Sequence, residues 1–172
     1  MTPSRVELAF PDKEPRVPAG VSIRPARRKD RGEVVAMSLA LLEEHRRLYG
    51  SDVVNDRGTH RQVRRTVSSH VRKGAVLVAE KEGVLIGFVL LSKARFMLRS
   101  ARPAGSITDI YVESGQRGRG VGSSLLGAGL AWLRARGYRR VLLNVTAGNP
   151  ARRLYERVGF LPFAESMEID MD

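Results

Sequence analysis

Residues 115–126, GQRGRGVGSSLL, place four glycines and two arginines directly before a run with helical periodicity. Glycine carries an entropic cost in such a position, so the pattern indicates that bare backbone comes close to a partner. A strand, a glycine-rich turn and a helix together form an anion site, because free backbone N–H groups and the positive end of the helix dipole face the ligand. The stretch therefore predicts a phosphate-binding turn.

Two common phosphate motifs do not fit this turn. Gly118, Gly120 and Gly122 have the spacing G-x-G-x-G, whereas the dinucleotide fingerprint needs G-x-G-x-x-G and a later acidic residue. The P-loop needs a lysine before serine or threonine, and this stretch has no lysine. On these residues alone, a tight turn without a ligand stays open as the alternative.

Several other chemistries are excluded by residue type. The chain has no cysteine, which excludes disulfides, thiolate nucleophiles and thiolate metal sites. It also has no G-x-S-x-G elbow, so a covalent acyl-enzyme has no support. The three histidines, His45, His60 and His70, lack the spacing of metal ligands, and we expect no metal site.

The elements that position the turn alternate along the chain. From apolar patterning, the predicted strands are 21–26, 75–81, 84–94, 106–113, 138–148 and 164–172. From periodicity and capping residues, the predicted helices lie between Asp30 and Gly50, over 59–74, over 121–137 ending at Gly137, and from Pro150 after the cap Asn149 to Gly159. This order predicts a mixed α/β fold around one sheet. Residues 1–20, with four prolines, are expected to form a flexible arm before a single domain over 21–172.

The turn and a second motif together resemble the GNAT superfamily of acetyl-CoA-dependent N-acetyltransferases. The family's turn has the form [QR]-x-x-G-x-[GA], which Arg117, Gly120 and Gly122 match. Its second motif is an asparagine before a helix carrying L-Y-E-x-x-G-F, matched by Asn149 and residues 154–160. The resemblance covers residues 21–172. It implies a mostly antiparallel sheet of six to seven strands, flanked by about four helices and splayed at the cofactor site.

The resemblance also implies acetyl-CoA as the acetyl donor and assigns the residues that bind it. Backbone amides of the turn would bind the pyrophosphate, and the preceding strand would pair with the pantetheine arm like an added strand. Asn149 would bind the cofactor on its far side. The residues assigned in this way are Ile110, Tyr111, Val112, Arg117, Gly118, Arg119, Gly120, Val121, Gly122, Ser123 and Asn149.

Acetyl transfer from a thioester to an amine needs one proton removed from the amine and one given to the leaving thiolate. Tyr155 matches the family's usual general acid. Asp109 and Glu113 lie two residues either side of Tyr111 on one face of the strand, and either carboxylate, or a chain of waters, could act as the base. Asp109 is favoured, because it matches one member of an acidic pair in polyamine acetyltransferases of this superfamily. A backbone N–H near Tyr111 or Val112 would meet the oxyanion.

The acceptor amine is left open. In this fold the first two helices and their connection form the acceptor wall, here residues 42–58. The acidic and polar residues of this wall are Glu43, Glu44, His45, Tyr49, Asp52 and Asp56. Its acids could hold a cationic amine, whereas Arg46, Arg47 and Arg57 point as readily to an acceptor that bears a carboxylate.

Net charge and composition leave two further classes of function. The chain carries 30 basic and 18 acidic residues, and a net charge of +12 favours anionic partners or reflects a solvated arginine-rich surface. The first is a nucleic-acid-binding module, but aromatic residues make up only 6% of the chain and no RNP-like or helix-turn-helix pattern occurs, which argues against it. The second is a non-catalytic regulatory protein that binds acetyl-CoA. We expect a cytoplasmic protein with no membrane segment, and analogy with relatives suggests a homodimer through C-terminal strands.

Overall fold

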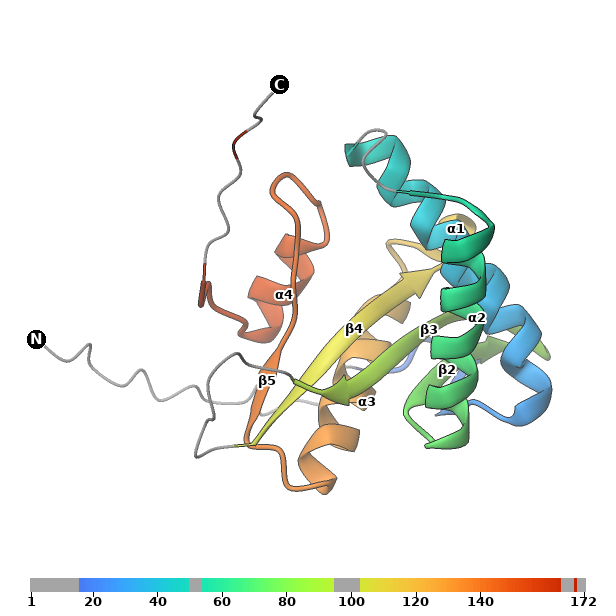
Figure 1. The fold of residues 1–172 in the computed structure, drawn as a ribbon. Helices are drawn as coiled ribbons and strands as arrows, with labels where there is room; N and C mark the ends of the chain where they lie inside the picture. Colours follow the sequence, from blue (N-terminus) through green and yellow to red (C-terminus); the bar gives the residue numbers. More distant parts are fainter. Residues whose placement is uncertain (1–15, 50–53, 95–102, 165–168, 170–172) are drawn as a thin grey trace, which may run out of the picture. The chain divides into compact units, whose positions relative to one another are not determined.

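The computed structural model describes residues 16–49, 54–94, 103–164 and 169. It divides into two compact units, residues 15–144 and a smaller unit that includes residues 145–172. In the described part of the larger unit, one sheet has the strand order β1-β2-β3-β4-β5 (Figure 1). The strands are β1 (Val21–Pro25), β2 (Val76–Lys81), β3 (Val84–Lys93), β4 (Ala104–Val112) and β5 (Arg140–Leu142). The first four are antiparallel neighbours, and β5 is parallel to β4.

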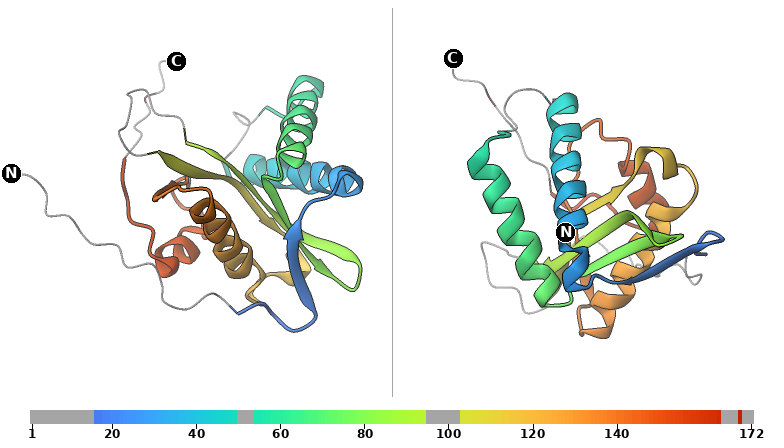
Figure 2. Two further views of the ribbon diagram at one scale, coloured as in Figure 1. Left: turned by 90° about the horizontal axis from the view of Figure 1, so that it is seen from below. Right: turned by 90° about the vertical axis from the view of Figure 1, so that its right-hand side faces the viewer.

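Helices cover both faces of this sheet. α1 (Arg31–Tyr49) and α2 (Arg57–Arg72) pack on one face, and α3 (Val121–Ala135) packs on the other (Figure 2). Between the sheet and α1 and α2 lies a buried core that includes Val34, Val67 and Phe88. The mixed, mostly antiparallel α/β fold is therefore as predicted. The described sheet has five strands, and most of the sixth predicted strand, over 164–172, lies outside the described residues.

The β2–β3 hairpin follows the sequence closely. Its two turn residues both have positive φ, 51° at Glu82 and 80° at Gly83. Two successive left-handed residues are the backbone of a type I′ turn, whose twist matches that of the flanking strands. The turn residues Glu82 and Gly83 therefore suffice to predict that β3, the neighbour of β4, pairs with β2 in an antiparallel hairpin.

The start of α1 differs from the prediction that Asp30 caps it. Asp30 does precede α1, as the last residue of a short 3-10 turn (Arg28–Asp30). Its buried carboxylate accepts from the Arg27 N–H at 2.6 Å and pairs with the Arg24 guanidinium at 2.6 Å, and Arg24 also pairs with Glu80. A buried carboxylate is stabilised more by pairing with a cation than by accepting from one more backbone N–H. The Asp30 carboxylate therefore points toward Arg24 of β1 and not toward the first turn of α1. The hydrogen bond from Arg24 also holds the pKa of Asp30 below its ordinary value.

A bulge interrupts the pairing of β3 with β4. Leu90 lies opposite Asp109 and Leu91 opposite Ile107, so Thr108 is an extra residue in β4. The Thr108 hydroxyl lies 3.1 Å from that of Ser92, which shares a face of β3 with Leu90. The bulge therefore turns both Thr108 and Asp109 toward the face covered by α1 and α2, as extra residues in a strand do.

β4 and β5 separate soon after they begin. They pair only over Ala104–Ser106 and Arg140–Leu142, and β5 is much shorter than the strand predicted over 138–148. Beyond Ser106, no described strand pairs with the outer edge of β4 (Figure 1). The splayed pair expected from the resemblance is present.

The smaller unit contains α4 (Arg152–Val158). The side chain of Asn149 accepts from the Ala151 N–H at 2.9 Å, and Gly159 ends the helix with φ of 100°. Both end signals agree with the prediction, although α4 begins two residues after Pro150. Within this unit the buried ring of Tyr155 packs edge-on against Phe160, with ring centroids 6.1 Å apart.

Candidate functional site

The glycine turn that leads into α3 is open and left-handed. Gly118 has φ of 73° and Gly120, the residue before the helix, has φ of 86°. A Cβ at Gly118 would meet no atom within 4 Å, and one at Gly120 would meet only Pro18 Cγ at 3.7 Å. These glycines are therefore required by backbone conformation, and the space above them is free for a ligand.

The first turn of α3 presents its backbone N–H groups at this opening. The first backbone hydrogen bond of the helix runs from the Ser124 N–H to the Gly120 carbonyl at 3.0 Å. The N–H groups of Val121, Gly122 and Ser123 precede it, and such groups have no partner within a helix. No acidic side chain lies in this first turn. The arrangement suits a phosphate group on both hydrogen-bonding and electrostatic grounds.

The two arginines of the turn differ in their surroundings. Arg119 is exposed. The Arg117 side chain donates to the Val112 carbonyl at 2.8 Å and to Glu44 at 2.6 Å, and its guanidinium lies 5.5 Å from the centre of the Tyr111 ring. Arg117 thus links the turn to the end of β4 and to α1.

The free edge of β4 leads to this turn. The Glu113 N–H donates to Ile86 of β3 at 3.0 Å, so residues 113 and 111 direct their backbone groups toward β3. By alternation, the N–H groups of Val112 and Ile110 point to the other edge, which β5 has left. The Tyr111 side chain packs in the core beside Phe88, with ring centroids 6.3 Å apart. Of the three residues assigned to the cofactor in this strand, Ile110 and Val112 direct their N–H groups to an edge with which no described strand pairs, although the Val112 carbonyl already accepts from Arg117.

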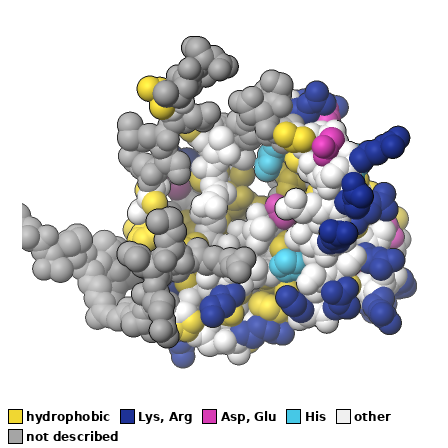
Figure 3. Space-filling model, in the orientation of Figure 1, with side chains coloured by type: hydrophobic (Ala, Val, Ile, Leu, Met, Phe, Trp, Pro, Cys, Tyr) yellow, Lys and Arg dark blue, Asp and Glu magenta, His cyan; other side chains and the backbone are white. Residues whose placement is uncertain are grey.

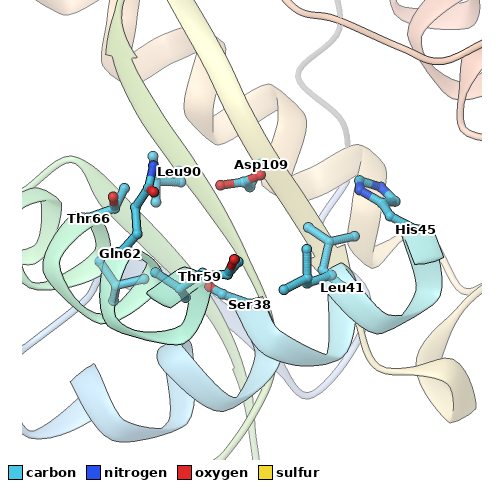
Figure 4. Close-up of a pocket in the computed structure, with 11 residues that line it drawn as sticks. Ser38, Leu41, His45, Thr59, Gln62, Thr66, Leu90 and Asp109 are labelled. Atoms are coloured by element: carbon cyan, nitrogen blue, oxygen red, sulfur yellow. The ribbon is translucent and has the colours of Figure 1, made fainter. Parts of the chain in front are cut away.

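Asp109 and Glu113, predicted on one face of the strand, line two different cavities. Asp109 lines a cavity of about 280 Å³ between α1, α2 and β3 (Figure 4). Glu113 lines a second cavity of about 350 Å³ with Glu33 and Tyr111, and the Tyr111 hydroxyl donates to the Glu113 carboxylate at 3.3 Å. Residues of α1 contribute to both cavities, because this helix lies across β4.

The surroundings of Asp109 favour its neutral form. Burial raises the pKa of the Asp109 carboxyl above its ordinary value, and the nearby histidines His45 and His70 offset part of this effect. On the face shown in Figure 3, histidine and acidic side chains lie near the centre, whereas lysine and arginine side chains lie along the right-hand side and the lower edge. A desolvated carboxylate with a raised pKa is a stronger base than an exposed one, so Asp109 is suited to accept a proton.

The acids predicted on the acceptor wall have structural partners instead. Glu44 pairs with Arg117. Glu43 accepts from the Asn55 side chain at 3.0 Å, and Asp56 caps α2 by accepting from the Thr59 N–H at 2.7 Å. Asp52 and the side chain of Tyr49 lie outside the described residues. The sequence does carry a signal for this cap, because Asp56 stands three residues before Thr59. The predicted helix start at 59 is therefore two residues late.

Polar residues that were not predicted from the sequence to form a site line the cavity around Asp109. They are Ser38 of α1 and Thr59, Gln62 and Thr66 of α2. In α2 these residues recur at intervals of three and four, so they share one face of the helix. That spacing was the available signal.

Asn149 and Tyr155 belong to the smaller unit, described above by itself. In the larger unit, the fold brings together the turn, the free edge of β4 and the Asp109 cavity. Among the described residues, no group of three or more histidine, aspartate or glutamate side chains is placed to hold a metal ion. Within the same residues, no helix combines the length and apolar character needed to cross a membrane.

Comparison with known proteins identifies the family. The model of the acetyltransferase (GNAT) family matches residues 40–160. The chain belongs to the GNAT acetyltransferase family. The GNAT match includes the glycine turn, β4 and α4 up to Phe160, so it covers both motifs that carried the resemblance.

Individual relatives agree with this family. A mycothiol acetyltransferase from Thermobispora bispora is 32% identical to this GNAT chain over 160 residues, covering 91% of the chain and 52% of the relative. The chain thus spans about half the length of the curated relatives it matches.

Solved GNAT structures agree with the fold. A GCN5-related N-acetyltransferase from Ralstonia eutropha superposes with a TM-score of 0.68 at 21% identity, covering 89% of this chain and all of that one. A predicted acetyltransferase from Clostridium acetobutylicum with acetyl-CoA gives 0.71 at 18% identity, covering 88% of this chain and 96% of that one. At these identities the likeness concerns the fold alone.

Proposed function

We propose that this chain transfers the acetyl group of acetyl-CoA to a primary amine, without a covalent acyl-enzyme. The observation that carries the proposal is the unpaired edge of β4 running directly into the open turn at Gly118 and Gly120. An extended arm can pair with the edge while a phosphate group at its end meets the helix N-terminus. The family match supports the same donor, and the C. acetobutylicum neighbour is described with acetyl-CoA.

The residues present fit this donor along its length. The N–H groups of Ile110 and Val112 are the ones free to bind the pantetheine arm. Those of Val121, Gly122 and Ser123 would bind the pyrophosphate, in the open space that side chains at Gly118 and Gly120 would fill. Arg119 adds an exposed positive charge, and Arg117 holds the turn to β4 and α1. Asn149 is carried over from the family motif as a further contact.

In the reaction the acceptor ammonium loses two protons and the leaving thiolate gains one. The first proton leaves before the nitrogen attacks, and the second leaves as the amide forms and replaces the proton given to the thiolate. Acetyl-CoA supplies the acetyl group as a thioester, whose C–S bond breaks as the amine nitrogen forms the C–N bond. Asp109, in its own cavity beside the β4 bulge, takes the proton from the acceptor ammonium. By carry-over from the family motif, Tyr155 would give its phenol proton to the departing thiolate, and a backbone N–H near Tyr111 or Val112 would meet the developing oxyanion.

Glu113 is the weaker candidate for the base. It lines the second cavity, and the Tyr111 hydroxyl donates to it. The cavity at the bulge therefore supports Asp109 rather than Glu113 as the group that meets the amine.

Thermal melts and a thiol-release assay test the proposal. At a hundredfold excess over the dissociation constant, acetyl-CoA and CoA should stabilise the fold by about 2.7 kcal/mol, and NAD and ATP by much less. Addition of an amine from a broad panel should then release free CoA. No selective stabilisation by CoA compounds would contradict the proposal. Binding without thiol release from any amine would favour the non-catalytic regulatory protein.

A further inference from the structure

The cavity around Asp109 has a distinctive lining, and its chemistry restricts the acceptor if the proposed function holds. Among the described residues, the lining combines apolar side chains with hydrogen-bonding groups and a single carboxylate, that of Asp109. The lining residues that carry the argument are Ser38, His45, Thr59, Gln62, Thr66 and Asp109. They come from α1, α2 and β4 and surround one opening (Figure 4). With a volume of about 280 Å³, the cavity is at the lower limit of small-molecule sites.

No lysine or arginine among the described residues lines this cavity. Arg46, Arg47 and Arg57, which the sequence offered as carboxylate partners, are all exposed, and Arg47 pairs with Glu43 at 3.5 Å. His45 is the basic side chain among the described lining residues, and it acts electrostatically to lower the pKa of Asp109. A substrate carboxylate would thus lose its water beside Asp109 without gaining a strong cation.

Hydrogen-bond acceptors and neutral polar groups are well represented. The Ser38 hydroxyl already donates to the Val34 carbonyl at 2.8 Å, so its oxygen is left to accept from a ligand. The Gln62 side chain is exposed at the rim and can both donate and accept. Among the described residues, none donates a hydrogen bond to the Asp109 carboxylate. These groups match an ammonium together with hydroxyl or amide groups on the same molecule.

We propose that the acceptor is a small primary amine that carries hydroxyl or amide groups and no carboxylate, in the class of amino alcohols and amino sugars. Its ammonium binds Asp109 before losing a proton to it, and its hydroxyl or amide groups bind Ser38, Gln62 and the two threonines. This inference rests on the proposed acetyl transfer and adds the chemical class of the acceptor.

Matched amines test the class directly. Serinol and serine differ in one CH₂OH group replaced by a carboxylate, and glucosaminitol and glucosaminic acid form a second pair of the same kind. In the thiol-release assay, kcat/KM should be at least about tenfold higher for the member of each pair that has no carboxylate. Equal or higher kcat/KM for serine and glucosaminic acid would overturn the proposal.

A gain of charge gives a second, independent test. Gln62→Arg adds a guanidinium to the cavity rim and should move the serine-to-serinol ratio of kcat/KM toward serine by about tenfold. Ser68→Arg adds the same charge to α2 outside the lining and should leave the ratio unchanged. An equal change in both variants would mean that overall charge, and not the cavity, sets the preference. That result would also overturn the proposal.

The same assay separates the two levels of inference. If the protein binds acetyl-CoA but acetylates only lysine side chains or peptide N-termini, the acceptor class is wrong and acetyl transfer stands. If it neither binds acetyl-CoA in the melts nor releases thiol with any amine, the proposed function fails, and the acceptor class fails with it.

Discussion

At the scale of single residues, Asp109 is the side chain on which the proposed chemistry depends most. Replacing it with asparagine removes the proton acceptor and keeps the shape of the side chain. At neutral pH, kcat/KM for the amine should fall by about 10²-fold or more. Glu113→Gln is the matched control, because Glu113 lines the other cavity, and it should keep most of the activity. Full activity in the Asp109 variant together with a loss in the Glu113 variant would reverse the assignment.

The same substitution should stabilise the fold. Because burial raises the pKa of Asp109 above its unfolded value, the folded state binds more protons, and the free energy of unfolding falls as pH rises through that raised pKa. The fall begins near the ordinary value of about 4 and persists at higher pH. Asp109→Asn removes this part of the pH dependence. Its Tm at neutral pH should therefore exceed that of the wild type. A lower Tm at neutral pH would show that the carboxylate is stabilising.

Tyr155 is the second residue with a separable role. Phenylalanine keeps the ring that packs on Phe160, so the variant should still fold. If the phenol protonates the leaving thiolate, the loss should appear in kcat, by about 10²-fold, with little change in acetyl-CoA affinity. The basic limb of the pH–rate profile should also shift. If the Tyr155→Phe variant keeps the wild-type kcat while chemistry is rate-limiting, the proton for the leaving thiolate comes from water and not from Tyr155.

At the scale of elements, the close approach of β3 to β4 holds the free edge in place. A Cβ at Gly87 would lie 2.5 Å from the Tyr111 carbonyl oxygen and 3.3 Å from Val112 Cα. Because backbone cannot rotate away as a flexible side chain can, Gly87→Ala should move the end of β4.

We expect this change to lower the free energy of unfolding by about 1–3 kcal/mol in a urea titration and to weaken acetyl-CoA binding. Gly115→Ala, where a Cβ meets nothing within 4 Å, is the control and should be nearly neutral. Equal stability of the two variants would show that the strands can separate at Gly87 without cost.

The elements also show which features the sequence could predict. The Glu82–Gly83 turn, the glycines at 118 and 120 and the end of α4 at Gly159 follow local rules, because each needs only its own positive φ. The bulge at Thr108 depends on the register of β4 against β3, which no local pattern specifies. Likewise, the pairing of Arg117 with Glu44 joins residues 73 positions apart, and only the packing of α1 brings them together.

At the scale of the whole molecule, the same limit explains the acceptor site. The sequence placed Asp109 and Glu113 on one face of a strand, but where α1 crosses β4 decides that they line different cavities. From the sequence alone, the acids of residues 42–58 could bind the acceptor amine. In the structure, Glu43, Glu44 and Asp56 instead have partners within the fold, which the packing of α1 and α2 brings near them. By contrast, the glycine turn is continuous in sequence, so its residues could be proposed for the cofactor one by one.

The central claim is that the open turn before α3 binds the pyrophosphate of acetyl-CoA. Titration calorimetry of acetyl-CoA into Gly120→Val, with Gly137→Val as control, tests it most directly. The two glycines lie at opposite ends of α3 with φ of 86° and 82°, and a side chain at either has room, so both variants carry similar backbone strain. We expect the dissociation constant for acetyl-CoA to rise by about tenfold or more in Gly120→Val and to stay at the wild-type value in Gly137→Val. Wild-type affinity in a folded Gly120→Val protein would contradict it.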